Sequence, residues 1–175
     1  MKPTSVTGKL WLITDENGKL ISNIDTDMIF HNAHLAITKI EEMGKHAFGN
    51  LKGWEDFPAK CGKGDIVMVG KNFGSGSSRQ QAVDCFASLG VSAIIAESYG
   101  SIYKRNAINS GMAIIEAPDL VNACPFQNGD TINVDFTTGK IASGSTKFDA
   151  KPMTEIQLNI YKAGSLFAYG KELVK

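Results

Sequence analysis

The sequence lacks the features that define several common classes of protein. Its three cysteines, Cys61, Cys85 and Cys124, stand far apart in 175 residues, so neither a disulfide framework nor a metal-binding cysteine motif can be read from their spacing. No apolar run is long enough to span a bilayer, and residues 1–18 lack the apolar core of a signal peptide. Lysine plus arginine equals aspartate plus glutamate, 18 of each, without a long block of one sign. These absences predict a reduced, cytoplasmic protein that binds neither nucleic acid nor a membrane.

The middle of the chain carries the clearest secondary-structure pattern. Short β-rich runs at residues 65–69, 91–97 and 112–117 predict buried strands, and apolar residues at helical spacing predict helices over residues 78–89 and 98–110. Alternating strands and helices are typical of a parallel sheet with right-handed crossovers. We therefore expect a small parallel α/β core in the centre of the sequence.

Several residues mark where the helices begin and end. Gly90 and Gly111 follow the last apolar residues of the two central helices, and Ser98 is placed to cap the second one. Thr154 and Gln157 form a possible capping box for a C-terminal helix.

The flanking regions differ from this core. Residues 128–143 alternate around a Thr-Gly turn and predict an antiparallel hairpin, and the C-terminal helix should end near Gly164. Residues 31–60 predict a long loop with a helix at about 39–48, and loops of this length are often functional. The whole chain, 1–175, is interpreted as one α/β domain with a β-rich periphery.

The stretch GKNFGSGSSRQQAV, residues 70–83, is the main candidate for a functional site. It does not match a Walker phosphate loop, a complete G-x-G-x-x-G dinucleotide fingerprint or a G-x-S-x-G nucleophile elbow. A tight strand-to-helix turn, in which glycines only relieve strain, explains the same letters. A functional role is favoured because the turn follows the carboxyl end of a strand, where open α/β sheets bind ligands. Ser77 and Ser78 lie near a helix N-terminus that attracts anions, and Arg79 adds a guanidinium suited to a carboxylate.

The N-F-G-x-G-S-S-R pattern resembles the signature of isopropylmalate isomerase small subunits and of the swivelling C-terminal domain of aconitases. NIDTDMI at residues 23–29, the block AIIAESYGSIYKRNAINSGM at 93–112 and the closing hairpin are similar to that family in the same order. The resemblance covers nearly the whole chain and implies a swivelling β/β/α domain. It also implies a hydro-lyase of leucine biosynthesis, which removes water from a small 2-hydroxy dicarboxylic acid and adds it back at the neighbouring carbon.

The resemblance implies a division of labour between two chains. A four-iron–four-sulfur cluster is expected on a large partner subunit, in a heterodimer or heterotetramer, and no cofactor or metal is expected on this chain. Ser77 is the implied base, acting as an alkoxide, and Asp27 the implied residue that orients catalytic groups. Ser78 and Arg79 are implied to bind the substrate, Arg79 by holding a carboxylate with two hydrogen bonds.

The sequence departs from the family at two places. Gln80 and Gln81 stand where the family has Glu-His, which removes a charge pair. The family's substrate-recognition loop corresponds to residues 31–38, and here it reads HNAHLAIT, with Ala36 where homoaconitase-like members carry an arginine. A buried carboxylate without a cation is costly, so an apolar substrate group is expected beside His34, Leu35, Ala36 and Ile37. Isopropylmalate fits best; methylmalate, 2,3-dimethylmalate and homoaconitate dehydratase subunits, or a non-catalytic carboxylate-binding module, stay open as alternatives.

Overall fold

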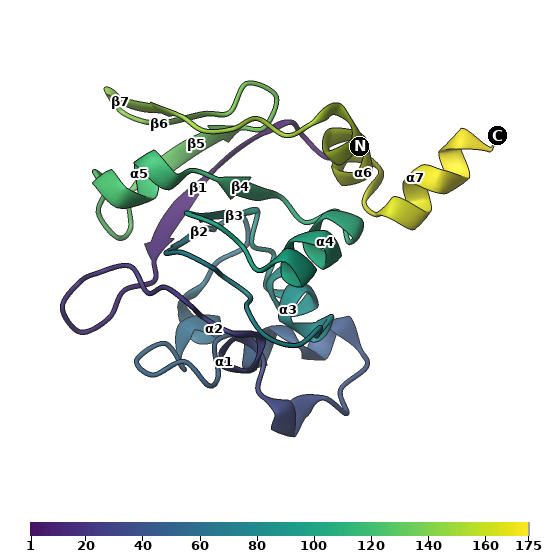
Figure 1. Cartoon of the computed structure of the whole chain (residues 1–175), viewed down its shortest axis with the longest axis horizontal. Coiled ribbons are helices and arrows are strands. Elements are labelled where there is room, and N and C mark those ends of the chain that lie inside the picture. The colour runs from purple at the N-terminus through teal and green to yellow at the C-terminus, as the bar shows by residue number, and fades with distance from the viewer. Residues whose placement is uncertain (175) are drawn as a thin grey trace.

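The computed structural model describes residues 1–174, which form a seven-stranded sheet with apolar clusters and helices packed on both faces (Figure 1). The strands are β1 (Ser5–Leu12), β2 (Ile66–Val69), β3 (Ala93–Ala96), β4 (Ile114–Glu116), β5 (Thr131–Asp135), β6 (Lys140–Ser143) and β7 (Thr146–Asp149). The α-helices are α1 (Thr26–Ile29), α2 (Phe57–Lys60), α3 (Gln81–Leu89), α4 (Ser101–Asn109), α5 (Pro118–Ala123), α6 (Glu155–Ala163) and α7 (Leu166–Leu173).

The strand order β4-β3-β2-β1-β5-β6-β7 joins a parallel half to an antiparallel half through β1. Residues 10–12 of β1 pair in parallel with β2, and residues 5–9 of the same strand pair antiparallel with β5. β2, β3 and β4 continue the parallel half, whereas β5, β6 and β7 form an antiparallel meander. The predicted parallel core and β-rich periphery are therefore confirmed, and the periphery continues the same sheet.

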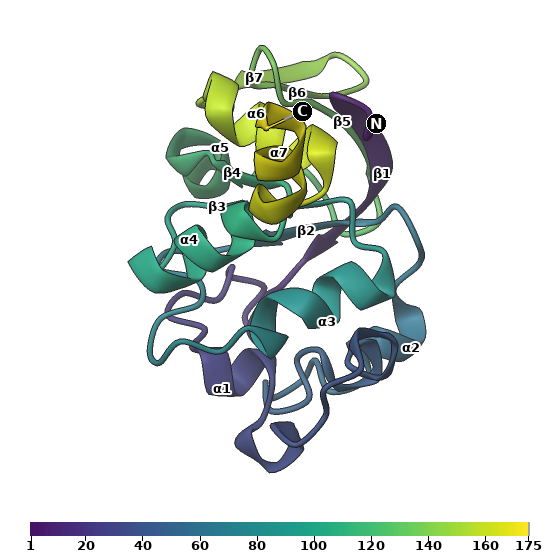
Figure 2. The same cartoon turned by 90° about the vertical axis from the view of Figure 1, so that its right-hand side faces the viewer.

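The parallel strands are buried on both faces, which explains their unbroken apolar letters. In β2, Val67 and Val69 belong to the cluster that includes Phe86 of α3, while Ile66 and Met68 belong to the cluster on the opposite face. Figure 2 shows α3 and α4 beside each other on the first face. α5 supplies Leu120 and Val121 to the opposite cluster.

Several predicted helix ends are confirmed. Gly90 ends α3 in the left-handed conformation, with φ 77°, and its N–H donates to carbonyls of the last turn. Thr154 and Gln157 form the expected capping box of α6, and Gly164, with φ 95°, closes that helix. The hairpin over residues 131–143 is also present, with Gly139 in its turn at φ 77°.

Both central helices begin three residues later than predicted. α3 begins at Gln81 and not at Ser78, and α4 begins at Ser101 without a side-chain cap. Ser98 does not cap α4, because its hydroxyl accepts the N–H of Asn72 at 2.9 Å. Ser78 and Ser98, which were expected to start the helices, instead belong to the loops that precede α3 and α4.

The helix predicted at residues 39–48 is wrong. This segment forms two short 3-10 turns, Ile40–Glu42 and Gly44–His46, followed by Phe48 at φ 58°. A Cβ atom on Gly44 would lie 2.9 Å from Ser88 Oγ of α3, so the segment is drawn close against that helix. Tertiary packing therefore overrides the local helical pattern.

Six strands and α-helices lie outside the sequence-based predictions: β1, β7, α1, α2, α5 and α7. In β1, exposed and half-buried residues alternate in the first half, and an apolar second half masks this pattern. α5 begins at Pro118, a residue type that is also common at the end of a strand. Within the described residues, none of the helices combines the length and the apolar character needed to cross a bilayer.

Candidate active site

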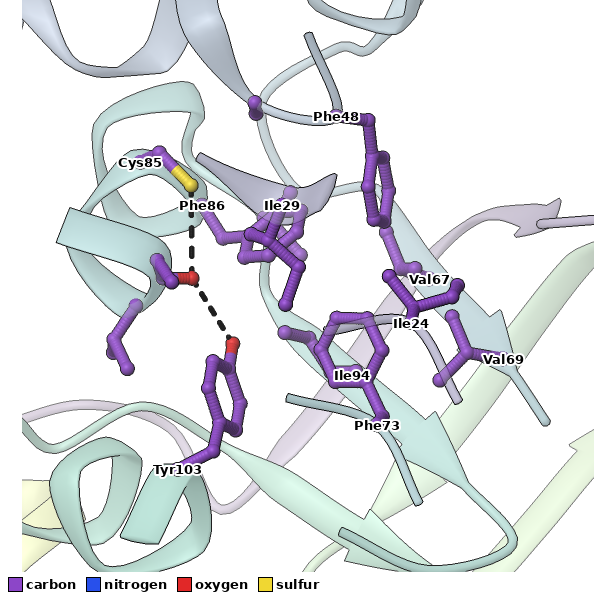
Figure 3. Close-up of a cluster of buried hydrophobic side chains, with 14 of the residues drawn as sticks. Ile24, Ile29, Phe48, Val67, Val69, Phe73, Cys85, Phe86, Ile94 and Tyr103 are labelled. Carbon is purple, nitrogen blue, oxygen red and sulfur yellow. Dashed lines mark hydrogen bonds between the residues drawn. The ribbon is translucent and has the colours of Figure 1, made fainter. Parts of the chain in front are cut away.

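The glycine–serine loop, residues 72–79, connects β2 to α3 and is anchored in the core by Phe73. That side chain is 1% exposed and packs edge-on against Tyr103, with ring centroids 5.2 Å apart (Figure 3). Gly74 is required beside it for two reasons. Its φ is +75°, and a Cβ atom there would lie 2.2 Å from Cγ of Tyr103.

Backbone hydrogen bonds hold the loop from two sides. On one side, Gly74 N–H donates to Ile24 at 2.7 Å and Thr26 N–H donates to the Ser75 carbonyl at 2.9 Å. On the other side, Phe73 N–H donates to the Ser98 carbonyl at 3.0 Å and Gly100 N–H returns a bond to Phe73 at 2.8 Å. The loop thus lies between the segment before α1 and the segment before α4.

The outer part of the loop presents a row of free donors. Within the described chain, the backbone N–H groups of residues 76–81 donate to no protein acceptor. Ser77 and Ser78 are exposed here, and they precede the first helical residue, Gln81, by four and three positions. The Ser78 hydroxyl accepts from Asn106 Nδ2 of α4 at 3.1 Å. Consecutive backbone donors next to serine hydroxyls are suited to binding an anion.

Asp27 and Arg79 are brought together across the site. Arg79 Nη1 donates to Asp27 Oδ1 at 2.9 Å, to the Phe30 carbonyl at 2.6 Å and to the Thr26 carbonyl at 3.4 Å. Asp27 also accepts from the Asn32 N–H and from Asn50 Nδ2, both at 2.9 Å. The Arg79 hydrogen bond, above all, lowers the pKa of the Asp27 carboxyl, so Asp27 is ionised at neutral pH.

Asp25, the first aspartate of the DTD element, has a separate role. Its carboxylate accepts the Met28 N–H at 2.8 Å and caps α1. This local bond is the turn-stabilising function that an aspartate at such a position commonly has.

The segment expected to be the substrate-recognition loop, residues 31–38, is called the recognition loop below, and it touches the same end of α3. Gln81 Nε2 donates to the Leu35 carbonyl at 3.3 Å, so one of the two unusual glutamines ties this loop to the helix. The other, Gln80, donates to Asp84 at 2.9 Å and to Ser110 at 2.7 Å. Leu35 and Ala36 are exposed, whereas Ile37 packs against the core cluster.

Histidines surround Phe30 at the base of this loop. The His34 and His46 rings are stacked, with centroids 3.8 Å apart, and both contact the edge of Phe30. His31 Nδ1 accepts the Ala33 N–H at 3.1 Å and caps the turn that contains His34. Burial, followed by the positive charges of His34 and Lys45, lowers the pKa of His46. The histidines therefore shape the loop by stacking and capping.

The three cysteines lie on separate elements and do not form a cluster site. Cys85 is buried in α3, while Cys61 and Cys124 follow α2 and α5 and are half-buried. Burial raises the pKa of the Cys61 thiol to about 12 and also raises that of Cys85, which opposes the thiolate form that metals bind. Among residues 1–174, no three histidine, cysteine or acidic side chains gather at metal-binding distance. The donor set of this chain does not fit an iron–sulfur cluster.

Three polar residues near the site were missed in the sequence. Thr26 Oγ1 donates to the Ser77 carbonyl at 3.0 Å, Asn106 contacts Ser78, and Asn50 contacts Asp27. Thr26 stands between the two aspartates of the DTD element. The signal in the sequence would have been this polar residue at a position where a buried side chain is required. Asn106 and Asn50 carry no pattern that separates them from ordinary surface residues.

The fold and the loop match a known class of domain. A family model described as the aconitase C-terminal domain matches residues 55–120, which include the glycine–serine loop, α3, β3, α4 and β4. The class is thus that of aconitase-type C-terminal domains.

Individual relatives narrow the class further. The 3-isopropylmalate dehydratase small subunit of Caldicellulosiruptor bescii is 40% identical over 159 residues, covering 90% of this chain and 93% of the relative. The small subunit from Aquifex aeolicus is 38% identical and covers 94% of each chain. The crystal structure of 3-isopropylmalate dehydratase from Methanocaldococcus jannaschii superimposes with a TM-score of 0.84 at 30% identity, covering 97% of this chain and 95% of the other. The chain belongs to the family of 3-isopropylmalate dehydratase small subunits.

Proposed function

We propose that this chain is the small subunit of a hydro-lyase that converts 2-isopropylmalate to 3-isopropylmalate by dehydration and rehydration, in leucine biosynthesis. Its membership of the dehydratase small-subunit family supports this reaction. The relatives are named small subunits, which supports a large partner subunit, and we propose that this partner carries the four-iron–four-sulfur cluster.

One observation carries the proposal: among the described residues, the backbone N–H groups of residues 76–81 have no protein acceptor, and they lie beside the exposed Ser77. A substrate with two carboxylates, and a base that becomes an alkoxide, both bring negative charge to this place. Preoriented backbone donors stabilise such charge without the cost of reorganising solvent. A turn that only relieved strain would not need so many consecutive donors without a protein partner.

In the proposed reaction, the Ser77 alkoxide takes the proton from the carbon next to a substrate carboxylate. The electron pair of that C–H bond forms the C=C bond as hydroxide leaves the neighbouring carbon, and addition of water with the opposite placement completes the isomerisation. The cluster on the partner would supply Lewis-acid activation of the departing hydroxyl. A free serine hydroxyl is a weak acid, so the donors of residues 76–81, Ser78 and Arg79 must favour its ionised form.

Arg79 is proposed to bind a substrate carboxylate with the part of its guanidinium that the protein leaves free. Nη1 donates to Asp27 and to the carbonyls of Thr26 and Phe30, which fixes the plane of the group. The remaining N–H groups of the fork are suited to a carboxylate. Asp27 is thus proposed to orient Arg79 by its charge and its hydrogen bond.

The recognition loop is proposed to select an apolar substrate group. His34, Leu35, Ala36 and Ile37 offer no permanent cation, and Lys39 is exposed with its Nζ 3.7 Å from Glu42. A third substrate carboxylate would find no fixed partner among these residues. An isopropyl group, in contrast, is compatible with Leu35, Ala36 and Ile37.

Co-expression with an aconitase-type large subunit under anaerobic conditions tests the proposal. The purified complex is assayed with 2-isopropylmalate, methylmalate, 2,3-dimethylmalate and homocitrate. We expect isopropylmalate to have the largest kcat/KM. A complex that dehydrates none of these acids would contradict the enzymatic function, and a preference for homocitrate would contradict the assignment of the recognition loop.

A further inference from the structure

Thr26 is an unusual residue in the core next to the glycine–serine loop. Within the described chain, and leaving tyrosines aside, only Thr26 and Asp65 are polar or charged and also buried; Thr26 is 3% exposed. Asp65 accepts hydrogen bonds from Trp11 and from the Gly62 N–H, and, within the described residues, it has no contact of this kind with the glycine–serine loop. The hydroxyl of Thr26, in contrast, donates to the carbonyl of Ser77 itself, at 3.0 Å.

The direction of this bond is unambiguous, because a carbonyl oxygen can only accept. The backbone N–H of Thr26 also donates to the Ser75 carbonyl at 2.9 Å. Two donors of one residue therefore hold the carbonyls on either side of Gly76, whose φ of +94° permits the sharp turn between them. Gly76 offers no side chain that could restrict this turn.

Holding the Ser77 carbonyl also sets what the next peptide presents to the substrate. The structure has no cis peptide bonds, so the C=O of Ser77 and the N–H of Ser78 point in opposite directions from one planar group. Since Thr26 binds the C=O from the buried side, the Ser78 N–H must face outward. It belongs to the row of free donors at residues 76–81.

We propose that Thr26 is a positioning residue for the dehydration, whose hydroxyl fixes the Ser77–Ser78 peptide so that the base and an anion-binding N–H face the substrate together. The inference rests on the proposed function of Ser77. Without this hydroxyl, the Ser77–Ser78 peptide is free to rotate about the ψ angle of Ser77 and the φ angle of Ser78. The chemical step should then suffer, whereas substrate affinity, which Arg79 and the recognition loop dominate, should not.

Thr26→Val and Thr26→Ser test the proposal in the complex with the large subunit. Valine keeps the shape of threonine without the donor, and serine keeps the donor without the methyl group. We expect Thr26→Val to lower kcat by about 10- to 100-fold with a change in KM of less than about threefold, by comparison with losses of oxyanion donors. Thr26→Ser should restore kcat to within about threefold of the unchanged protein.

Three results would overturn the inference: unchanged kcat in Thr26→Val, equal loss in Thr26→Val and Thr26→Ser, or a loss confined to KM. If Thr26→Val does not assemble, Thr26→Ala against Thr26→Ser isolates the hydroxyl, because both lack the methyl group. Ser77→Ala is measured in parallel. If the Ser77→Ala complex is active, Ser77 is not the base. If the Ser77→Ala complex is inactive and the Thr26→Val complex is fully active, only the role of Thr26 is contradicted.

Discussion

The glycine–serine loop and the recognition loop meet at the start of α3 but are held in place differently. The first is fixed by backbone bonds to segments about 50 and 25 positions away, from Thr26 to Ser75 and from Phe73 to Ser98. The recognition loop is held mainly by bonds between its own neighbours, such as His34 N–H to the His31 carbonyl at 3.0 Å.

This difference is consistent with the proposed division between chemistry in the first loop and specificity in the second. Proton transfer needs donors and base held to within a fraction of an ångström, which long-range bonds to a packed sheet provide. Selection among alkyl groups depends on shape and polarity alone, and a locally bonded loop can change these without disturbing the sheet. The two loops should therefore respond in opposite ways to substitution.

Ser77→Ala should have the largest effect, because it removes the proposed base. We expect kcat to fall by about 10²- to 10⁴-fold, the usual contribution of a general base, while the complex with the large subunit still assembles. Ser75→Ala is the matched control: it lies two positions away in the same loop, and its known contact is through its backbone carbonyl. Comparable activity of the two variants in the anaerobic assay would contradict the role of Ser77.

Gly74→Ala should disrupt the anchor of the glycine–serine loop in the core and so lower the stability of the fold. An alanine would adopt φ +75° and place its Cβ against the ring of buried Tyr103, whose hydroxyl donates to the Ala82 carbonyl. We expect unfolding free energy to fall by about 2–5 kcal/mol from backbone strain and overpacking combined. Chemical denaturation measures this loss.

Gly18→Ala provides the comparison for Gly74→Ala. Its φ is +76°, but no atom lies within 4 Å of an added Cβ, so only the strain of roughly 1 kcal/mol should appear. Equal losses in the two variants would mean that contact with Tyr103 contributes nothing.

The same contrast explains which parts of the structure could be predicted from the sequence. β2, β3 and α3 were predictable because each is an unbroken local pattern in the sequence with glycines near its ends. β1 was not, because its two halves pair with strands that begin at residues 66 and 131. The expected helix at 39–48 failed because close packing of Gly44 on α3 is a tertiary effect.

In the candidate site, too, some features could be predicted from the sequence and others could not. Ser77, Arg79 and Asp27 were identified by resemblance to a family, and backbone physics alone supported an anion site at the turn. The Asp27–Arg79 ion pair joins residues 52 positions apart, and spacing could not have predicted it. Thr26 was missed because its role depends on a carbonyl 51 positions later, at Ser77.

Ala36→Arg tests whether specificity resides in the recognition loop. Ala36 is exposed and within a locally bonded segment, so the fold should accept arginine. We expect kcat/KM for homocitrate relative to isopropylmalate to rise about 10- to 100-fold, as a carboxylate gains a partner. Ala33→Arg, also exposed in this loop, is the control. A similar gain from Ala33→Arg would show a general effect of charge.

His46→Phe should have the smallest effect, and it concerns how the recognition loop is held. In the folded protein the pKa of His46 lies below its ordinary value of 6.5. Between these two pKa values, the unfolded chain carries a proton on His46 more often than the folded protein does. Stability should therefore decrease as the pH falls through 6.5, down to the lowered pKa of the folded state. Phenylalanine keeps a ring against His34 and Phe30 but cannot titrate, so it should remove part of this slope. Unfolding free energies between pH 5 and 8 measure it; an identical slope in the variant would mean that the stacked imidazole does not couple this loop to pH.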